Sequence, residues 1–381
     1  MKQLPLSGLL VLEFSQYLSG PAAGLRLADL GARVIKIERP VTGDAGRKLA
    51  IKNLWNGEDS LLFHTINRNK ESITADMKDR SDLELIRKLI AKADVLIHNF
   101  RPDVMSRHGL DHASIVSLNP RIVYAEISGY GRTGPWKDKP GQDLLVQAMS
   151  GLAYTTGNGT DDPVPFGISI GDILSGSQLV QGILAALIRR NKTGQGALIE
   201  VSMLESLLDF QFELLTTYYR TRRQPERSAL SNAQPLLSAP YGVYKTADGY
   251  ISLSMMDIHL LADTIGCVAL KAFRLEEVFS RRDEIKQILT DFLREGDSSY
   301  WLELLHGAGL WSMPVLNWNE MTQGDAYRAL HMEQAIASGE ERIITTRCPI
   351  RFDGKILLSE RPAPQLGEHT ERIMEELGNQ N

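Results

Sequence analysis

The residue whose surroundings best suit covalent chemistry is Asp172. It is the single acidic residue in the run FGISIGDILSGSQLVQGILAAL. An Asp that precedes an apolar helical pattern is a favoured helix N-cap, which is the commoner role for such a residue. At a helix N-terminus a carboxylate is also expected to be ionised at pH 7, and a nucleophile is expected to need that form. Small neighbours leave room for a bulky electrophile; they are Gly167, Ser169, Gly171, Ser175 and Gly176.

Basic residues follow or precede several predicted strands. Arg39 comes directly after the strand-like run 33–38, NRNK (67–70) leads into the next run, and NFRP (99–102) overlaps the end of the run DVLIHNF (94–100). A single Arg is usually a surface charge, but several at one sheet edge suit a ligand that carries phosphate. The glycine-rich stretch 128–135 is either a plain loop or a backbone that approaches such a ligand closely.

Composition excludes several classes of protein. The chain has 381 residues, is 43% hydrophobic and 23% charged, and carries a net charge of -5, so neither nucleic acid nor a membrane surface is an expected partner. His98, His108 and His112 form no triad, and no metal-ligand spacing occurs, so we expect no metal. Cys267 and Cys348 are expected to be free thiols. No signal peptide is evident and the apolar stretches are short of a membrane span, which predicts a cytoplasmic protein.

The first half of the chain alternates strand and helix signals. Short apolar runs at 8–14, 33–38 and 72–77 predict buried strands, and 82–93 has helical periodicity. This alternation predicts an α/β fold with a doubly wound, mostly parallel sheet. Ligands in such folds bind beyond the carboxyl ends of the strands.

The pattern changes after residue 200. The segment 203–223 predicts one long helix that runs into a polar linker, and YGVYKTADGYISLSM predicts a hairpin. We therefore expect four parts: 1–202, a large domain; 203–234, helix and linker; 235–318, a small α+β domain; and 319–381, a linker and a C-terminal part.

Taken in order, these stretches resemble one family over almost the whole chain, the class III coenzyme A transferases (CaiB/BaiF family). The resemblance rests on LSGLLVLEFSQYLSGPAAGLRLADLGARVIKIERP, NRNKESITADMK, ADVLIHNFRPDVMSRHGLD, NPRIVYAEISGYGRTGPW, GQDLLVQAMSGLAYTTG, GDILSGSQLVQGILAALIRRNKTGQGALIEVSML and LGEHTERIMEEL. It implies a Rossmann-like large domain built from both chain ends, a small domain, and a homodimer of interlocked subunits.

The resemblance also implies a function. Asp172 matches the family's nucleophile, and coenzyme A or an acyl-CoA is the substrate, with no permanently bound cofactor. Positions that match the family's coenzyme A contacts are Arg39, Asn99, Phe100, Arg101, Met105, Arg107 and Lys137, with Arg68 and Asn69 near the adenine end. The implied activity is of the EC 2.8.3 type: Asp172 forms a mixed anhydride with the donor acyl group and then a thioester with coenzyme A. Amides at the start of the helix would stabilise the oxyanions.

The main rival is the α-methylacyl-CoA racemase branch of the same fold. Racemases carry a His where this chain has Gln142, and a Gln cannot exchange a proton at neutral pH. Gln142, Leu18 and Met255 are expected to form a substrate pocket for a larger, partly apolar acid, since the oxalate-type pattern is absent at these positions. The remaining alternatives are a non-catalytic coenzyme A-binding protein and a lyase or hydratase. We expect succinyl-CoA as donor and a short dicarboxylate or branched acid as acceptor.

Overall fold

The computed structural model describes residues 4–338 and 341–378. By its internal contacts the chain divides into two units. The first comprises residues 1–146, 169–207 and 331–381, and the second comprises 147–168 and 208–330. The second unit thus takes in the expected linker and the segment 147–168 besides the residues expected for the small domain.

The first unit is built on a six-stranded parallel sheet in the order β5-β2-β1-β6-β7-β8. Its strands are β1 (Leu10–Glu13), β2 (Arg33–Glu38), β5 (Lys70–Thr74), β6 (Val95–His98), β7 (Val123–Ser128) and β8 (Ala197–Ser202). The chain adds β2 and β5 on one side of β1, and then β6, β7 and β8 on the other. The strand order therefore reverses between β1 and β6, the point at which sheets of this kind bind ligands.

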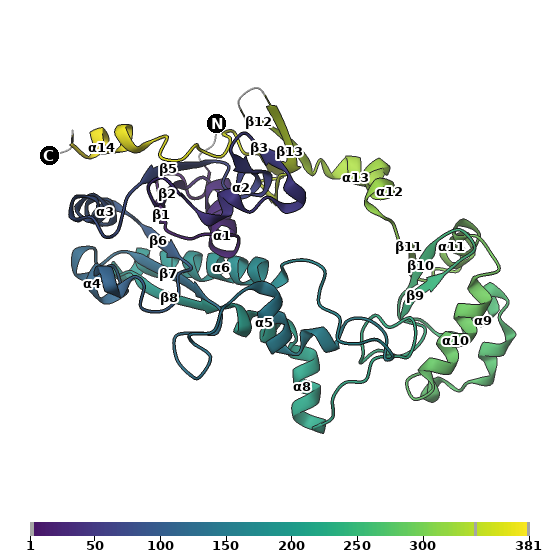
Figure 1. Ribbon diagram of the computed structural model, residues 1–381. Helices are drawn as coiled ribbons and strands as arrows, with labels where there is room; N and C mark the ends of the chain where they lie inside the picture. Colours follow the sequence, from purple (N-terminus) through teal and green to yellow (C-terminus); the bar gives the residue numbers. More distant parts are fainter. Residues whose placement is uncertain (1–3, 339–340, 379–381) are drawn as a thin grey trace. The chain divides into compact units, whose positions relative to one another are not determined.

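Helices cover both faces of this sheet. On one face, α1 (Ser19–Asp29) and α6 (Ile170–Thr193) pack against each other, and α6 lies along β7 and β8 (Figure 1). On the other face, α3 (Arg80–Lys92), α4 (His112–Leu118) and α14 (Thr370–Gly378) close a core around Leu12, Ile35 and Ile73. The remaining elements of this unit are α2 (Leu61–Ile66) and the strand pairs β3 (Trp55–Asn56) with β4 (Asp59–Ser60), β12 (Glu333–Ser338) with β13 (Glu341–Thr346), and β14 (Cys348–Phe352) with β15 (Lys355–Leu357). The boundaries between the units fall within α5 (Asp143–Ser150) and α7 (Met203–Phe210).

Helix α6 differs from the expectation that every apolar stretch of the chain is short of a membrane span. With 24 residues, it is by length and composition apolar enough to cross a membrane. In the structure it packs against α1, β7 and β8, and its residues Leu179, Val180 and Ile183 are buried there. Its apolar character is that of a core helix covering a parallel sheet.

The second unit contains a three-stranded antiparallel sheet in the order β11-β10-β9. Its strands are β9 (Gly242–Lys245), β10 (Tyr250–Leu253) and β11 (Ser312–Pro314), and its helices are α8 (Phe212–Thr221), α9 (Ile258–Ile265), α10 (Arg282–Leu293), α11 (Ser298–Gly307), α12 (Trp318–Gln323) and α13 (Asp325–Leu330). β9 and β10 pair as the predicted hairpin.

Two predicted elements differ from those observed. The strand expected at 72–77 is β5 at Lys70–Thr74, because Lys70 and Glu71 are buried through ion pairs although they read as polar. The single helix expected at 203–223 is two helices, α7 and α8. They are separated at Gln211, whose side chain donates to the carbonyl oxygen of Ser150 at 3.2 Å.

The buried centre of the sheet gives a stability prediction. Leu12 is fully buried in β1 among residues of α3 and the neighbouring strands. Leu12→Ala should lower the free energy of unfolding by about 2–5 kcal/mol, since it leaves a cavity in a closed core. Urea denaturation measures the change. Val41→Ala, at a residue 92% exposed, is the control and should change little; equal losses would contradict the assigned core.

Candidate functional site

Asp172 lies in the first turn of α6 and does not cap it. The N-cap is Ser169, whose side chain makes no capping hydrogen bond. The capping carboxylate comes from another helix: Asp143 Oδ1, at the start of α5, accepts from the backbone amides of Gly171 at 2.7 Å and Asp172 at 3.2 Å. The N-cap interpretation of Asp172 is therefore wrong, and its own carboxylate is left for other contacts.

The start of α1 lies beside the Asp172 carboxylate. Ser19 supplies both a side-chain and a backbone hydrogen bond to it. The two helices approach closely because α6 has Gly176 at the crossing, where a Cβ would lie 2.7 Å from the carbonyl oxygen of Ser19. Gly176 thus serves helix packing, and through it brings Ser19 to the carboxylate.

The protonation of Asp172 differs from the expectation. Burial, and next the negative charge of Asp143, raise the pKa of Asp172 to about 7, although the hydrogen bonds from Ser19 oppose the shift. Asp172 is therefore about half protonated at neutral pH and is not fully ionised. A carboxylate that titrates near pH 7 in a site of this kind is a typical functional residue.

The amides in the first turn of α6 do not form the expected oxyanion site, because they already have hydrogen-bond acceptors. Those of Gly171 and Asp172 are already bonded to Asp143, and the amide of Ile173 donates to the carbonyl oxygen of Ser169 at 3.2 Å. The donors that face the Asp172 carboxylate are instead the hydroxyl and amide of Ser19 on α1. In the sequence, Ser19 is distinguished only by its place before a helix, and Asp143 only by its place at the start of α5.

The loop between β1 and α1, residues 14–19, is held by Asn99 from the end of β6. The Asn99 amide nitrogen donates to the carbonyl oxygen of Gln16 at 2.7 Å and to the hydroxyl of Ser19 at 3.2 Å. Its oxygen accepts from the Gln16 amide at 2.8 Å. The side chain expected to contact coenzyme A thus braces the loop, and through Ser19 it is linked to Asp172.

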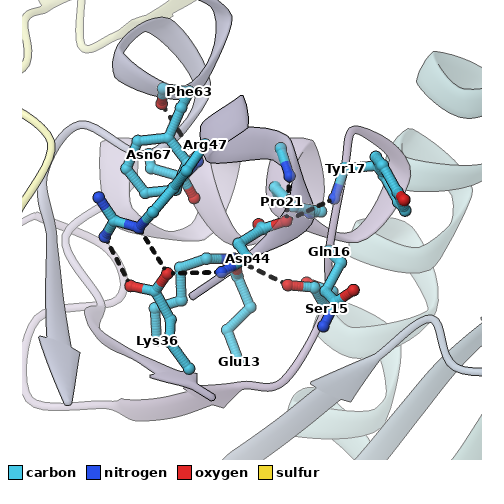
Figure 2. Close-up of polar contacts among 12 residues, drawn as sticks. Glu13, Ser15, Gln16, Tyr17, Pro21, Lys36, Asp44, Arg47, Phe63 and Asn67 are labelled. Carbon is cyan, nitrogen blue, oxygen red and sulfur yellow. Dashed lines mark hydrogen bonds and ion pairs between the residues drawn. The ribbon is translucent and has the colours of Figure 1, made fainter. Parts of the chain in front are cut away.

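A buried cluster of charged side chains also holds this loop in place (Figure 2). Lys36, on β2, donates to Glu13 Oε1 at 2.9 Å and to the carbonyl oxygen of Ser15 at 2.7 Å, and it pairs with Asp44 Oδ2 at 2.8 Å. Asp44 Oδ1 in turn accepts from the amide of Tyr17 at 3.1 Å. Tyr17 has a φ of 63°, a costly conformation for a residue with a side chain, and this amide contact fixes it.

The charges of the cluster compensate one another. Lys36 and Glu13 are completely buried. Burial opposes the ionised form of Glu13, yet the attraction of Lys36 and Lys70 keeps its pKa below the usual value. Burial and the charge of Lys36 lower the pKa of Lys70 to about 8 in spite of its pairing with Glu13 at 2.7 Å. Helix α1 fits over the cluster because Gly24 faces it, where a Cβ would lie 1.7 Å from Glu13 Oε2.

A cavity of about 460 Å³ opens at the carboxyl ends of β1, β2, β5 and β6, where the strand order reverses. Two of the predicted contacts, Arg39 and Phe100, line it. Its wall also includes residues that the sequence analysis did not single out, namely Gln16 and Asp76, Met77 and Lys78. The rule that ligands lie beyond strand carboxyl ends could have identified the last three, had the end of β5 been placed at Thr74.

The other predicted contacts are distributed as follows. Arg101 and Met105 line a smaller hollow with Phe100, in which Met105 is buried in the core. Arg107 is exposed in the short 3-10 helix Ser106–His108, and Lys137 is exposed on the loop after β7.

Arg68 and Asn69 do not lie at this edge. They precede β5, whose first residue pairs with Val34 near the start of β2, so they belong to the amino ends of the strands. Arg68 is buried and donates to Ser359 Oγ at 2.7 Å, and Asn69 Oδ1 accepts from the amides of residues 360 and 361 at 3.0 Å. Both residues hold the C-terminal segment, and their expected approach to the adenine of coenzyme A stays a prediction.

The predicted substrate-pocket residues fall into different units. Leu18 is the N-cap of α1, next to Ser19, and Gln142 is exposed immediately before Asp143. Met255 belongs to the second unit and is 58% exposed. Within residues 4–338 and 341–378 no group of three or more His, Cys, Asp or Glu side chains could hold a metal ion.

The chain matches one family of known proteins over nearly its whole length. The family model described as CoA-transferase family III matches residues 6–370. The chain belongs to this family. It is accordingly a CoA-transferase, an enzyme of the EC 2.8.3 type.

Curated relatives and a solved structure match along nearly the whole chain. An acetyl-CoA:oxalate CoA-transferase from Acetobacter aceti is 35% identical and the match covers 98% of this chain and 95% of the relative. A succinate–glutarate CoA-transferase from Agrobacterium fabrum is 33% identical, with 98% and 96% covered. The crystal structure of a CaiB/BaiF family protein from Brucella suis has a TM-score of 0.86 and 30% identity, with 99% and 100% covered.

The ion cluster gives a second stability prediction. Lys36→Met should lower the free energy of unfolding by about 3–5 kcal/mol, since it leaves two carboxylates buried without their shared cation. Lys271→Met is the matched control: it removes an exposed ion pair with Asp263 and should cost less than about 1 kcal/mol. Chemical denaturation of the two variants measures the difference, and similar losses would show that the cluster does not stabilise the fold.

The raised pKa of Asp172 predicts a pH dependence of stability. Between the ordinary Asp pKa of 3.8 and the raised pKa of about 7, the folded state binds the proton more tightly than the unfolded state does. Stability therefore falls as pH rises through this window, by at most about 1.4 kcal/mol per pH unit. Asp172→Asn has no titrating group at this position and does not lose stability in this way. The free energy of unfolding of the variant minus that of the parent should therefore increase from pH 4 to pH 7 and level off above about pH 8. Denaturant titrations at fixed ionic strength test this; a difference that stays constant with pH would refute it.

Proposed function

We propose that this enzyme moves coenzyme A from an acyl-CoA donor to a carboxylic acid through covalent intermediates on Asp172. A carboxylate oxygen of Asp172 attacks the carbonyl carbon of the thioester. The C–S bond breaks, and the coenzyme A thiolate leaves with the electron pair. The product is a mixed anhydride. The thiolate then attacks the aspartyl carbonyl carbon, which releases the donor acid with one oxygen from Asp172 and leaves an enzyme thioester. The acceptor acid repeats both steps in reverse.

The observation that carries this proposal is the course of the loop 14–19. It runs from the wall of the cavity to the carboxylate of Asp172. Phe14 and Gln16 line the cavity, and Ser19 contacts Asp172. Three Cα–Cα steps separate Gln16 from Ser19, so these two residues are at most about 11 Å apart. A ligand whose nucleotide occupies the cavity therefore has its reactive end within reach of Asp172 if it follows this loop.

The charges around the cavity suit the phosphates of coenzyme A. Arg39 and Lys78 are exposed at its wall, and Arg101 is exposed in the adjoining hollow. Phe100 lines both depressions and offers an aromatic face to a base or to an apolar chain. Arg107 and Lys137, both exposed, are proposed as further phosphate contacts, while Met105 and Asn99 shape the wall from behind.

Succinyl-CoA is the proposed donor, and a short dicarboxylate or a branched acid is the proposed acceptor. Similarity alone does not separate the substrates, since relatives that use oxalate and glutarate are 35% and 33% identical to this chain. Leu18 and Gln142 are proposed to contact the acyl chain, and Met255 is kept as a third proposed contact. The working form is proposed to be an interlocked homodimer in the cytoplasm.

Asp172→Ala should abolish transfer, since no other group of the chain would carry the acyl intermediate. Asp291→Ala, which removes an exposed carboxylate on α10, is the matched control and should retain full activity. Transfer is measured by acyl-CoA product formation with succinyl-, acetyl- and propionyl-CoA against a panel of acids that includes oxalate and glutarate. More than trace activity in the Ala variant would refute the role of Asp172.

Isotope labelling tests the anhydride route directly. An acceptor acid labelled with ¹⁸O in its carboxylate should leave label in the Asp172 peptide after turnover, and quenched enzyme should carry coenzyme A on the same peptide. A racemase would instead exchange the α-hydrogen of a 2-methylacyl-CoA with solvent and leave no ¹⁸O on Asp172. A protein that only binds coenzyme A would show neither.

A further inference from the structure

Asp143 caps the first turn of α6 from a separate helix, 28 and 29 residues before the two amides that it binds. A single oxygen, Oδ1, accepts from the amides of both Gly171 and Asp172, at 2.7 and 3.2 Å. The two carboxylates are thus joined through the backbone of the residue proposed as nucleophile. Asp143 is part of a separate helix, α5, so this contact fixes the start of α6 from outside.

We infer that Asp143 is a positioning residue for the transfer reaction: it holds the backbone of Asp172 in place, and its negative charge favours the acylated form of Asp172 over the free carboxylate. This inference rests on the proposed function. It assigns two separate tasks to the Asp143 side chain. The side chain accepts hydrogen bonds from two backbone amides, and it supplies a negative charge close to Asp172.

The electrostatic task follows from the change of charge during the reaction. In its ionised, nucleophilic form Asp172 carries a negative charge close to Asp143, and the two repel each other in a partly buried site. When Asp172 attacks the thioester, its charge passes to the departing thiolate and the anhydride is neutral. The repulsion is therefore relieved in the acylated enzyme, and the free carboxylate is also a more basic nucleophile than an unperturbed Asp.

The other groups near Asp172 do not supply this charge. Ser19 on α1 contributes hydrogen bonds only, and the charged residues of α1, Arg26 and Asp29, lie toward its far end. Within β7 and β8, Glu126 and Glu200 lie near Arg132. Glu205 on α7 accepts from the hydroxyl of Ser202 at 2.5 Å. Among the described residues, Asp143 is the charged group whose field acts on Asp172.

Two substitutions separate the tasks. Asp143→Asn keeps an oxygen that can accept from both amides but removes the charge, whereas Asp143→Ala removes both. In Asp143→Asn the acid limb of the pH profile of kcat/KM should move to lower pH by about one unit or more, and kcat on the plateau should fall several-fold. In Asp143→Ala, kcat should fall further, by about 10-fold to 100-fold, with little change in KM for the acyl-CoA.

A measurement that needs no substrate tests the inference separately from the transfer reaction. The carboxyl band of Asp172, obtained as the infrared difference between each protein and its Asp172→Asn counterpart, gives the pKa of Asp172 directly. That pKa should fall in Asp143→Asn. An unmoved pKa and pH profile would overturn the electrostatic task, and equal kcat in the Asn and Ala variants would overturn the backbone task. Transfer that survives in Asp172→Ala would instead refute the proposed function, whatever the Asp143 variants do.

Discussion

One buried ammonium group, that of Lys36, determines the path of the chain beside the reactive carboxylate. It binds Glu13, the carbonyl oxygen of Ser15 and Asp44, all without access to water. Because an unpaired charge in this place is costly, the three partners cannot separate independently. The turn after β1 is therefore rigid although it contains a residue, Tyr17, in a left-handed conformation.

The site itself is assembled where three helices begin. α1, α5 and α6 start at Ser19, Asp143 and Ile170, and the contacts among their first turns place Asp172 between a hydroxyl and a second carboxylate. Helix starts normally favour anions, so the raised pKa of Asp172 reflects a competition. Burial and the charge of Asp143 outweigh the hydrogen bonds from Ser19.

Much of the fold followed from the sequence because its signals are local. The strand at 33–38 and the helix near 82–93 are read from runs of apolar residues, and the structure has them at Arg33–Glu38 and Arg80–Lys92. The contacts of the site could not be read in this way. The pairing of Asp143 with the amide of Asp172 joins residues 29 apart, and that of Asn99 with Gln16 joins residues 83 apart. No spacing rule relates such residues before the sheet order is known. The contact of Arg68 with Ser359 likewise joins residues 291 apart, so the sequence alone could not reveal it.

The same long-range contacts impose an order on synthesis. Arg47 donates to the carbonyl oxygen of Pro364 at 3.2 Å, and Arg68 to Ser359. On the ribosome these buried guanidinium groups emerge early, whereas their partners emerge only after residues 208–330 of the second unit. All six strands of the parallel sheet lie before residue 203, so they are synthesised while Arg47 and Arg68 still lack these partners. The segment that contains Ser359 and Pro364 therefore docks on a sheet whose strands have already been made.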